Sequence, residues 1–263
     1  MHNRTLSHPA PSFPADMPGV FPGTRTVCLS VTRSTNDEAR RPEFRHGDIV
    51  LAEEQTAGRG QRGNSWESRP GRNLTFSIVL EPAFLPAECQ FYLSETICLG
   101  IADTLEASGI EARIKWPNDI YIGDRKASGI LIENDLCGTT LRRSIAGIGL
   151  NVNQESFSPD LPNPVSLRAA AGRTFDRSAL LTDLCAKVSA RYRMLEEGDV
   201  ATLERDYHAR LYRLDTPAWY AAPDGRRFRG TIRRVEPAGE LVVEHRDGSL
   251  KSYLFKEIEF IVG

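Results

Sequence analysis

The sequence predicts an α+β protein with a mixed, mainly antiparallel sheet, flanking helices and a small β-rich tail. Three observations support this fold class. Short segments with strand-like apolar spacing recur through the chain, residues 87–108 carry the amphipathic pattern of a helix, and the last stretch of about fifty residues holds only short strand-like runs between turns. Strands and helices do not alternate strictly, which disfavours a parallel Rossmann sheet.

Each element is placed by its apolar spacing and by the turn residues around it. Strands are predicted over residues 27–31, 49–52, 74–80, 112–115, 129–133 and 141–151, and in the tail over 229–235, 241–245, 251–255 and 259–262. Helices are predicted over 87–108, 178–196 and 200–211. A short helix is also predicted, because Thr35 to Glu38 fits a capping box with Thr35 as N-cap, and Pro42 would end it.

These patterns divide the chain into three parts. Residues 1–24 contain five prolines and little that could form a core, so we expect a flexible N-terminal arm. Residues 25–213 form the main domain. Residues 214–263 should form a small β-barrel, since several short strands in about fifty residues favour that architecture.

The bulk composition narrows the class of protein. With 263 residues, 40% of them hydrophobic and 26% charged, the chain has the composition of a soluble globular protein. The net charge of −2 gives no global positive field for nucleic acid or an anionic membrane, and no long apolar run predicts a signal peptide or a membrane span. The five cysteines lack zinc-ligand spacing, so we expect reduced thiols in a cytoplasmic protein and no metal site formed by the chain itself.

The glycine- and arginine-rich loop Gly58–Trp66 lies between two predicted strands. Its three glycines let the backbone approach a ligand closely, and Arg59 and Arg62 supply fork-shaped donors suited to a carboxylate or a phosphate. Trp66 could anchor a loop that otherwise moves. Such a loop alone is more often a solvated hairpin tip, and it lacks the Gly-Lys-Ser/Thr of a P-loop.

Two lysine-containing motifs lie beside predicted strands. Lys115–Asp119 combines a lysine, a proline-stiffened turn and a carboxylate with a tryptophan that a plain turn does not need. Lys126 stands at the mouth of a strongly apolar strand that contains Gly129, and glycine within a strand often marks close approach of a ligand. A plain turn and a solvated edge lysine are the simpler interpretations of these motifs.

Two further motifs complete the set. Gly147–Asn153 carries two glycines and two asparagines along one predicted strand, which again suggests that a ligand approaches the backbone. Ser34-Thr35-Asn36 follows a strand, and its hydroxyl groups could cap a helix or bind a polar, uncharged part of a ligand.

Taken together and in this order, the five motifs resemble those of the biotin protein ligases (biotin–[acetyl-CoA-carboxylase] ligases). The pair Gly-Arg-Gly-x-Arg-Gly-x-x-Trp and Lys-Trp-Pro-Asn-Asp is highly specific, and the resemblance covers roughly residues 26–262. It implies a catalytic domain like the core of class II aminoacyl-tRNA synthetases. The tail, with Phe228-x-Gly230-x-Ile232 and Phe255–Ile258, is similar to the SH3-like C-terminal domain of that family.

The resemblance implies a reaction in two steps. The carboxylate of biotin attacks the α-phosphorus of ATP to give biotinyl-5′-AMP and pyrophosphate. A lysine of a biotin carboxyl carrier protein domain then attacks the mixed anhydride and releases AMP. Mg²⁺ accompanies ATP, with no protein ligand assigned. Members of the family often form homodimers through the catalytic sheet. Bifunctional members carry an N-terminal helix-turn-helix domain, which needs roughly 60 residues, so we expect a ligase that does not bind nucleic acid.

The resemblance also assigns roles by position. Catalytic roles fall to Lys126, Arg59, Arg62 and Asp119, with Lys126 as the main cation and Asp119 orienting or deprotonating the incoming lysine. Biotin binding falls to Ser34, Thr35, Asn36, Gln55, Gly58, Arg59, Gly60, Gln61, Lys126 and Gly129, and binding of ATP or the adenylate to Arg62, Trp66, Lys115, Asn118 and Asn151. Some members have Arg where this chain has Gln61, which keeps a hydrogen-bonding group but loses a charge. We therefore expect this position to affect how tightly the adenylate is retained.

Two other functions are compatible with parts of this pattern. Lipoate ligases and octanoyl transferases share the scaffold and the attack on a carrier lysine, and Lys-Trp-Pro-Asn-Asp occurs in such relatives too, whereas the glycine–arginine loop favours biotin. A non-enzymatic module that binds nucleic acid through the arginines is disfavoured by the net charge of −2.

Overall fold

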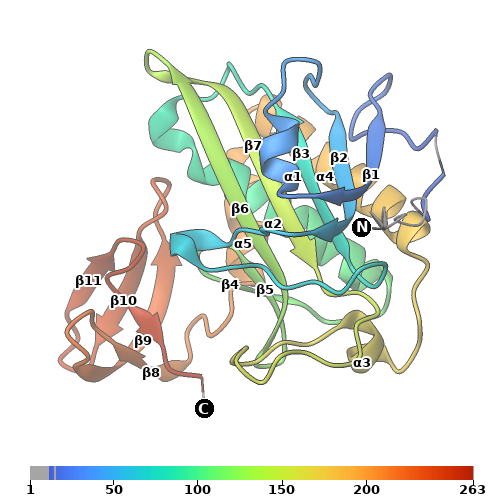
Figure 1. Ribbon diagram of the computed structural model, residues 1–263. Helices are drawn as coiled ribbons and strands as arrows, with labels where there is room; N and C mark the ends of the chain where they lie inside the picture. Colours follow the sequence, from blue (N-terminus) through green and yellow to red (C-terminus); the bar gives the residue numbers. More distant parts are fainter. Residues whose placement is uncertain (1–11, 15, 263) are drawn as a thin grey trace, which may run out of the picture.

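The computed structural model describes residues 12–14 and 16–262, apart from the side chain of Arg62. Its centre is a seven-stranded sheet with the order β1-β2-β3-β7-β6-β5-β4 (Figure 1). The strands are β1 (Thr26–Thr32), β2 (Ile49–Gln55), β3 (Leu74–Leu80), β4 (Arg113–Lys115), β5 (Asp119–Ile122), β6 (Arg125–Cys137) and β7 (Thr140–Leu150). Only β1 with β2 is a parallel pair within this sheet, so the predicted mainly antiparallel α+β fold is confirmed.

Helices cover the two faces of the sheet unequally. The helices α2 (Phe91–Ala107), α4 (Arg177–Glu196) and α5 (Val200–Ala209) pack together behind the sheet, where the large hydrophobic core lies (Figure 1). On β2 and β3 the side chains alternate, so Ile49 and Ile78 enter this core while Val50 and Val79 face the other way. In the described part of the chain, the short helix α1 (Thr35–Ala39) packs on that second face, and the larger helices lie on the other side, which leaves room for a ligand (Figure 1).

The remaining short helices lie in connecting segments. They are η1 (Gln61–Gly63), η2 (Ala87–Cys89) and α3 (Leu167–Ala171). None of the helices in the described part of the chain combines the length and the apolar character needed to cross a membrane.

The helix after the first strand is as short as predicted, but its predicted cap is wrong. Ser34, not Thr35, is the N-cap residue, and no side chain caps the helix. The hydroxyl of Thr35 instead lies 3.1 Å from Oε1 of Gln55, a residue 20 positions later. A long-range partner has therefore displaced the local capping interaction.

The described part of the predicted arm 1–24 packs against the main domain, in contrast to the expected flexible arm. Phe13 and Val20, which stand between the prolines, are buried in the large hydrophobic core. The backbone N–H and the hydroxyl of Ser12 both donate to Glu53 on β2, at 2.8 and 2.6 Å. Residues 1–11 lie outside the described residues.

The tail forms a separate five-stranded sheet with the order β11-β10-β9-β8-β12 (orange and red in Figure 1). Its strands are β8 (Pro217–Ala221), β9 (Arg227–Val235), β10 (Leu241–His245), β11 (Leu250–Tyr253) and β12 (Glu259–Phe260). Within the described residues its end strands β11 and β12 do not pair with each other, so the sheet is open in its hydrogen bonding. Trp116 ties the two sheets together, since its indole N–H donates to the carbonyl oxygen of Gly239 at 2.9 Å.

Candidate functional site

The free face of the large sheet provides the floor of the candidate site. In the register of the sheet, Gly149 of β7 lies opposite both Thr75 of β3 and Gly129 of β6, and Gly147 lies opposite Ser77 and Leu131. The glycines remove side chains from the middle of this face, so the backbone of β6 and β7 is open to a ligand. Small and hydroxyl-bearing residues surround that opening.

A cavity of about 1610 Å³ lies over this floor and extends to the C-terminal sheet. Residues from all the predicted motifs converge on it. Those on its wall are Ser34, Thr35, Asn36, Gln55, Arg59, Gly60, Gln61, Trp66, Lys115, Asn118, Asp119, Lys126 and Gly129. The linear motifs therefore form one site.

One end of the cavity is neutral and polar. Oε1 of Gln55 accepts a hydrogen bond from the backbone N–H of Thr35 at 2.7 Å, which joins the end of β2 to the start of α1. The side chain of Ser34 makes no capping bond, and Ser34 lies on the cavity wall. Amide and hydroxyl groups of this kind suit a ligand ring that carries both donors and acceptors but no charge.

The loop Gly58–Trp66 folds over the floor as a small hairpin. Gly60 N–H donates to Asn64 O at 2.6 Å, and Trp66 N–H donates to Gly58 O at 3.0 Å. The indole of Trp66 lies on the glycine floor, since a Cβ placed on Gly149 would stand only 2.1 Å from Cε2 of Trp66. Glycine at this position therefore lets the tryptophan close the loop, as an anchor would.

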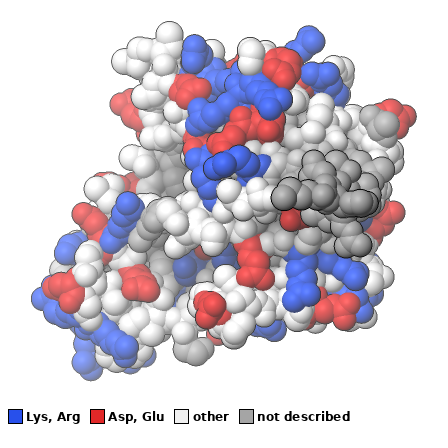
Figure 2. All heavy atoms as spheres, in the orientation of Figure 1, with Lys and Arg blue, Asp and Glu red and all other residues white. Residues whose placement is uncertain are grey.

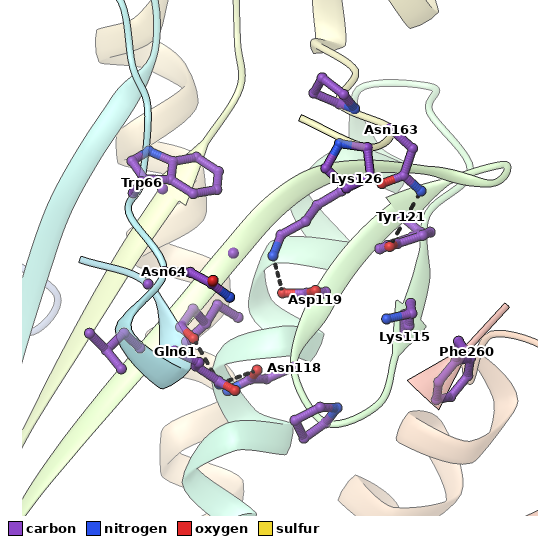
Figure 3. Close-up of a pocket in the computed structure, with 18 of the residues that line it drawn as sticks. Gln61, Asn64, Trp66, Lys115, Asn118, Asp119, Tyr121, Lys126, Asn163 and Phe260 are labelled. Carbon is purple, nitrogen blue, oxygen red and sulfur yellow. Dashed lines mark hydrogen bonds and ion pairs between the residues drawn. The ribbon is translucent and has the colours of Figure 1, made fainter. Parts of the chain in front are cut away.

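Gln61 fastens the tip of the same loop to the opposite wall. Its side-chain amide donates to Oδ1 of Asn118 at 2.7 Å and to the carbonyl oxygen of Ile130 at 3.2 Å (Figure 3). Gln61, which is replaced by Arg in some members of the family that the sequence resembles, thus links the loop to two other parts of the site.

A lysine and a carboxylate meet in the middle of the cavity. Nζ of Lys126, on β6, lies 2.7 Å from Oδ1 of Asp119, on β5 (Figure 3). The side chains are 33% and 23% exposed, so both groups are accessible from the cavity and partly shielded from water. A cation in such surroundings interacts with a ligand anion more strongly than a fully solvated one does.

Lys115 occupies a more enclosed position toward the C-terminal sheet. Its Nζ lies 4.7 Å from the ring centre of Phe260 and 5.4 Å from that of Tyr121, one ring from each sheet (Figure 3). Burial lowers the pKa of Lys115, and the nearby carboxylate of Asp119 counteracts this. The aromatic faces partly replace the hydration that its ammonium loses.

Arg59 points toward α1 in this structure. Its guanidinium is 2.7 Å from Oδ1 of Asp37 and 3.0 Å from Oε2 of Glu133. Glu133 also accepts a hydrogen bond from the side chain of Asn36 at 2.7 Å, so these groups link the loop to α1 and β6. The side chain of Arg62 lies outside the described residues.

Comparison of the sequence with known proteins identifies the family of this chain. A model of the biotin/lipoate A/B protein ligase family matches residues 28–151. A biotin–[acetyl-CoA-carboxylase] ligase of Paracoccus denitrificans is 32% identical over 228 residues, which cover 82% of this chain and 92% of that protein. The chain belongs to the biotin protein ligases.

Other biotin protein ligases extend this similarity. The bifunctional ligase/repressor BirA of Salmonella typhimurium is 34% identical over 237 residues, covering 88% of this chain and 72% of that protein. The solved structure of a biotin protein ligase from Aquifex aeolicus, in complex with biotin and ATP, has a TM-score of 0.77 with 24% identity. It covers 90% of this chain and 99% of that chain, and it shares the fold described here.

Two of the residues assigned from the ligase pattern lie behind the cavity wall. Asn151 is buried, and its Nδ2 donates to the carbonyl oxygen of Lys126 at 3.5 Å. Gly58 packs against Gln55 and Trp66, because a Cβ there would lie 2.9 and 2.7 Å from their atoms. Both positions support residues that line the cavity.

The structure also brings in residues that the linear motifs did not identify. Phe260 reaches the site from the tail, and its contact with Lys115 has no signal in the sequence. Thr75 and Ser77 do have one, since polar residues at alternate positions interrupt an otherwise apolar buried strand. Glu133 ends the predicted strand 129–133, but only its contacts with Asn36 and Arg59 show that it belongs to the site.

Mg²⁺ would have few protein ligands among the described residues of this site. Among the described residues, no group of three or more His, Cys, Asp or Glu side chains could hold a metal ion. Mg²⁺ that accompanies a nucleotide needs only one or two carboxylates, because phosphate oxygens and water supply the other ligands. Asp119 and Asp124 on the cavity wall fit that more limited requirement.

Proposed function

We propose that this chain activates biotin with ATP and transfers it to a lysine of a biotin carboxyl carrier protein domain. The arrangement of the cavity carries this proposal: a neutral polar end at Thr35 and Gln55 and a cationic centre at Lys126 lie on one glycine floor, under one loop. This polarity matches biotin, whose ureido ring is neutral and whose other end is a carboxylate. Membership of the biotin protein ligases supports the same substrate.

In the first step two negatively charged groups must meet, because the carboxylate of biotin attacks the α-phosphate of ATP. A cation between them stabilises the charge that builds up in the transition state. We assign this task to Lys126, whose Nζ lies beside Asp119 and 3.2 Å from a Cβ built on Gly129 of the floor. Arg59 would assist after leaving Asp37 and Glu133 for the ligand, and Arg62 is the second loop cation.

The substrate would lie along the floor between the two ends. We assign the ureido ring to Ser34, Thr35, Asn36 and Gln55, with the loop backbone from Gly58 to Gln61 beside it. The apolar part of biotin then passes over Gly129, where no side chain obstructs it. The carboxylate reaches Lys126.

The nucleotide would occupy the part of the cavity nearer the C-terminal sheet. Lys115 supplies a positive charge there, and Asn118 supplies amide groups close to the loop. Trp66 and Asn151 would border the adenylate. Mg²⁺ bound with the phosphates would add positive charge and help to orient them.

In the second step a neutral lysine amine must attack the anhydride, so a proton must leave the incoming ammonium. We assign the orientation or deprotonation of this amine to Asp119, whose carboxylate faces the cavity. While Lys126 is 2.7 Å away, Asp119 also positions the catalytic cation for the first step.

The wider organisation follows from the same assignment. We propose a catalytic domain over 25–213 with a class II synthetase-like core, preceded by the segment 1–24 and followed by an SH3-like C-terminal domain over 214–263. A cytoplasmic homodimer formed through the large sheet is the expected assembly. Nucleic acid is not an expected partner, since basic and acidic side chains are interspersed on the face shown in Figure 2.

The decisive experiment is ATP–pyrophosphate exchange with biotin, lipoate and octanoate as alternative acids. We expect exchange that depends on biotin and Mg²⁺, because only the acid that fits both ends of the cavity is activated. Exchange with lipoate or octanoate but not with biotin would overturn the proposal and favour a lipoate or octanoate ligase.

A further inference from the structure

Ser77 is a fully buried hydroxyl directly beneath the polar end of the site. It belongs to β3, whose other residues are apolar apart from Thr75, and its exposed fraction is 0%. Its Oγ lies 2.6 Å from Oδ1 of Asn36 and 2.8 Å from Oγ1 of Thr35. It does not line the cavity, so any effect on a ligand must pass through these two residues.

The orientation of Asn36 is fixed by its other contact. Glu133, which also binds Arg59, presents a carboxylate oxygen that can only accept, so the Nδ2 group of Asn36 must face it at 2.7 Å. The carbonyl oxygen of the Asn36 side chain therefore faces Ser77. Because that oxygen cannot donate, the single hydroxyl proton of Ser77 must lie on this 2.6 Å contact.

The position of the proton on Ser77 determines where the hydroxyl proton of Thr35 points. With its proton committed to Asn36, Ser77 can only accept from Thr35 across 2.8 Å. The second acceptor for this hydroxyl is Oε1 of Gln55, which lies 3.1 Å away and also receives the backbone N–H of Thr35 at 2.7 Å, so both acceptors draw the proton away from the cavity. The proton of Thr35 thus points into the protein, and its lone pairs remain for the cavity.

A neighbouring glycine shows that the sheet accommodates this network of hydrogen bonds between hydroxyl and amide groups. Gly147 lies opposite Ser77 in the register of β3 and β7. A Cβ at Gly147 would come within 2.2 Å of Oδ1 of Asn36, so the position of Asn36 requires glycine there. Water cannot take the place of Ser77, because the residue is completely enclosed.

We propose that Ser77 is a positioning residue that makes the pocket specific for a ring with adjacent N–H and C=O groups. Because its own proton goes to Asn36, Ser77 accepts the proton of Thr35. The hydroxyl oxygen of Thr35 is then held as an acceptor for a ligand N–H. Nε2 of Gln55, which donates no hydrogen bond within the described part of the chain, stands beside it as a donor for the ligand carbonyl. A cyclic urea presents this pattern, whereas a dithiolane ring or an alkyl chain does not. The inference rests on the proposed function and names the group that sets its selectivity.

The test compares Ser77→Ala with wild type in biotin-dependent pyrophosphate exchange. Loss of one buried hydrogen bond that acts on a ligand contact should raise KM for biotin about tenfold, while KM for ATP and kcat stay within about twofold. Ser144→Ala is the matched control, since Ser144 is equally buried in β7 and its hydroxyl has no partner among the described residues. That variant should behave as wild type.

Two cyclic carbamate analogues of biotin provide a readout that a purely structural role would not change. In each of them a ring oxygen replaces one ureido N–H. Wild type should discriminate about tenfold against the analogue that lacks the N–H facing Thr35, and Ser77→Ala should reduce this to about threefold or less. Equal discrimination by both proteins, or a parallel rise in KM for biotin and ATP, would overturn the proposal.

A second variant that retains a hydrogen-bond donor covers the case in which Ser77→Ala does not fold. Ser77→Cys keeps a side chain of similar shape with a weaker donor, so it should show the same selective rise in KM for biotin to a smaller extent. An unchanged KM in folded Ser77→Cys and Ser77→Ala would contradict the inference. Absence of biotin-dependent exchange in wild type would instead contradict the proposed function, so the two failures are distinguishable.

Discussion

The contact between Gly149 and Trp66 allows a quantitative test of loop closure. In Gly149→Ala the new Cβ would lie 2.1 Å from Cε2 of the indole, and a normal carbon–carbon contact needs about 3.5–4.0 Å. One of the two must move by roughly 1.5 Å. The strand β7 is paired on both sides at this position, so the indole and its loop are the parts that can yield.

Displacing the indole should open the loop. Overpacking of this kind costs about 1–3 kcal/mol, and 2 kcal/mol corresponds to about a 30-fold loss of the closed state. We expect KM for biotin and ATP to rise by about that factor. Trypsin should also cleave the loop readily at Arg59 or Arg62 even when both substrates are present, whereas in wild type the substrates should protect it.

Gly100→Ala is the matched control for this experiment. Its Cβ would lie 2.5 Å from Cγ2 of Val188, between α2 and α4 and away from the cavity. It should lower the melting temperature through a similar clash while leaving both KM values unchanged. If Gly149→Ala keeps wild-type KM values and wild-type protection from trypsin, the closed position of Trp66 has no role in ligand binding.

Three further substitutions test separate parts of the site. Lys126→Met should lower kcat for pyrophosphate exchange about 100- to 1,000-fold with an unchanged circular dichroism spectrum, because a cation at the reacting groups is lost; activity within a few-fold of wild type would exclude Lys126 from the mechanism. Gln61→Leu should speed the release of biotinyl-5′-AMP about tenfold in a dilution assay, since the loop loses its hydrogen bonds to Asn118 and Ile130, and an unchanged release rate would contradict that role. Lys115→Met should raise the urea midpoint at pH 7, because burial lowers the pKa of this lysine and the folded state holds its ammonium at a cost. That gain should disappear as the pH rises from the lowered pKa toward the ordinary value of 10.5, and a gain that persists at high pH would point to packing instead.

The sequence predicted those parts of the structure that depend on local spacing. The strand 74–80 and the helices near 178–196 and 200–211 follow from apolar periodicity, and the structure has them within about two residues. The site motifs were also recognisable, because the glycines, the arginines and the Lys-Trp-Pro-Asn-Asp turn are contiguous in the chain.

Long-range partners explain what could not be predicted. The hydroxyl of Thr35 is directed by Gln55 and Ser77, not by its own helix, so a local capping rule gave the wrong N-cap. Phe260 reaches Lys115 only because the tail sheet packs beside the main domain. The burial of Phe13 likewise depends on a surface that residues 1–24 do not themselves encode.

Formation of biotinyl-5′-AMP in this cavity is the reaction that defines the proposed activity. Its most direct test is mass spectrometry of the protein incubated with ATP, Mg²⁺ and an equimolar mixture of biotin, lipoate and octanoate, without a carrier protein. We predict that biotinyl-5′-AMP is the predominant acyl-adenylate and that it transfers to a carrier lysine when a carrier domain is added. Accumulation of lipoyl- or octanoyl-AMP in its place would contradict the assignment of the polar end to a ureido ring.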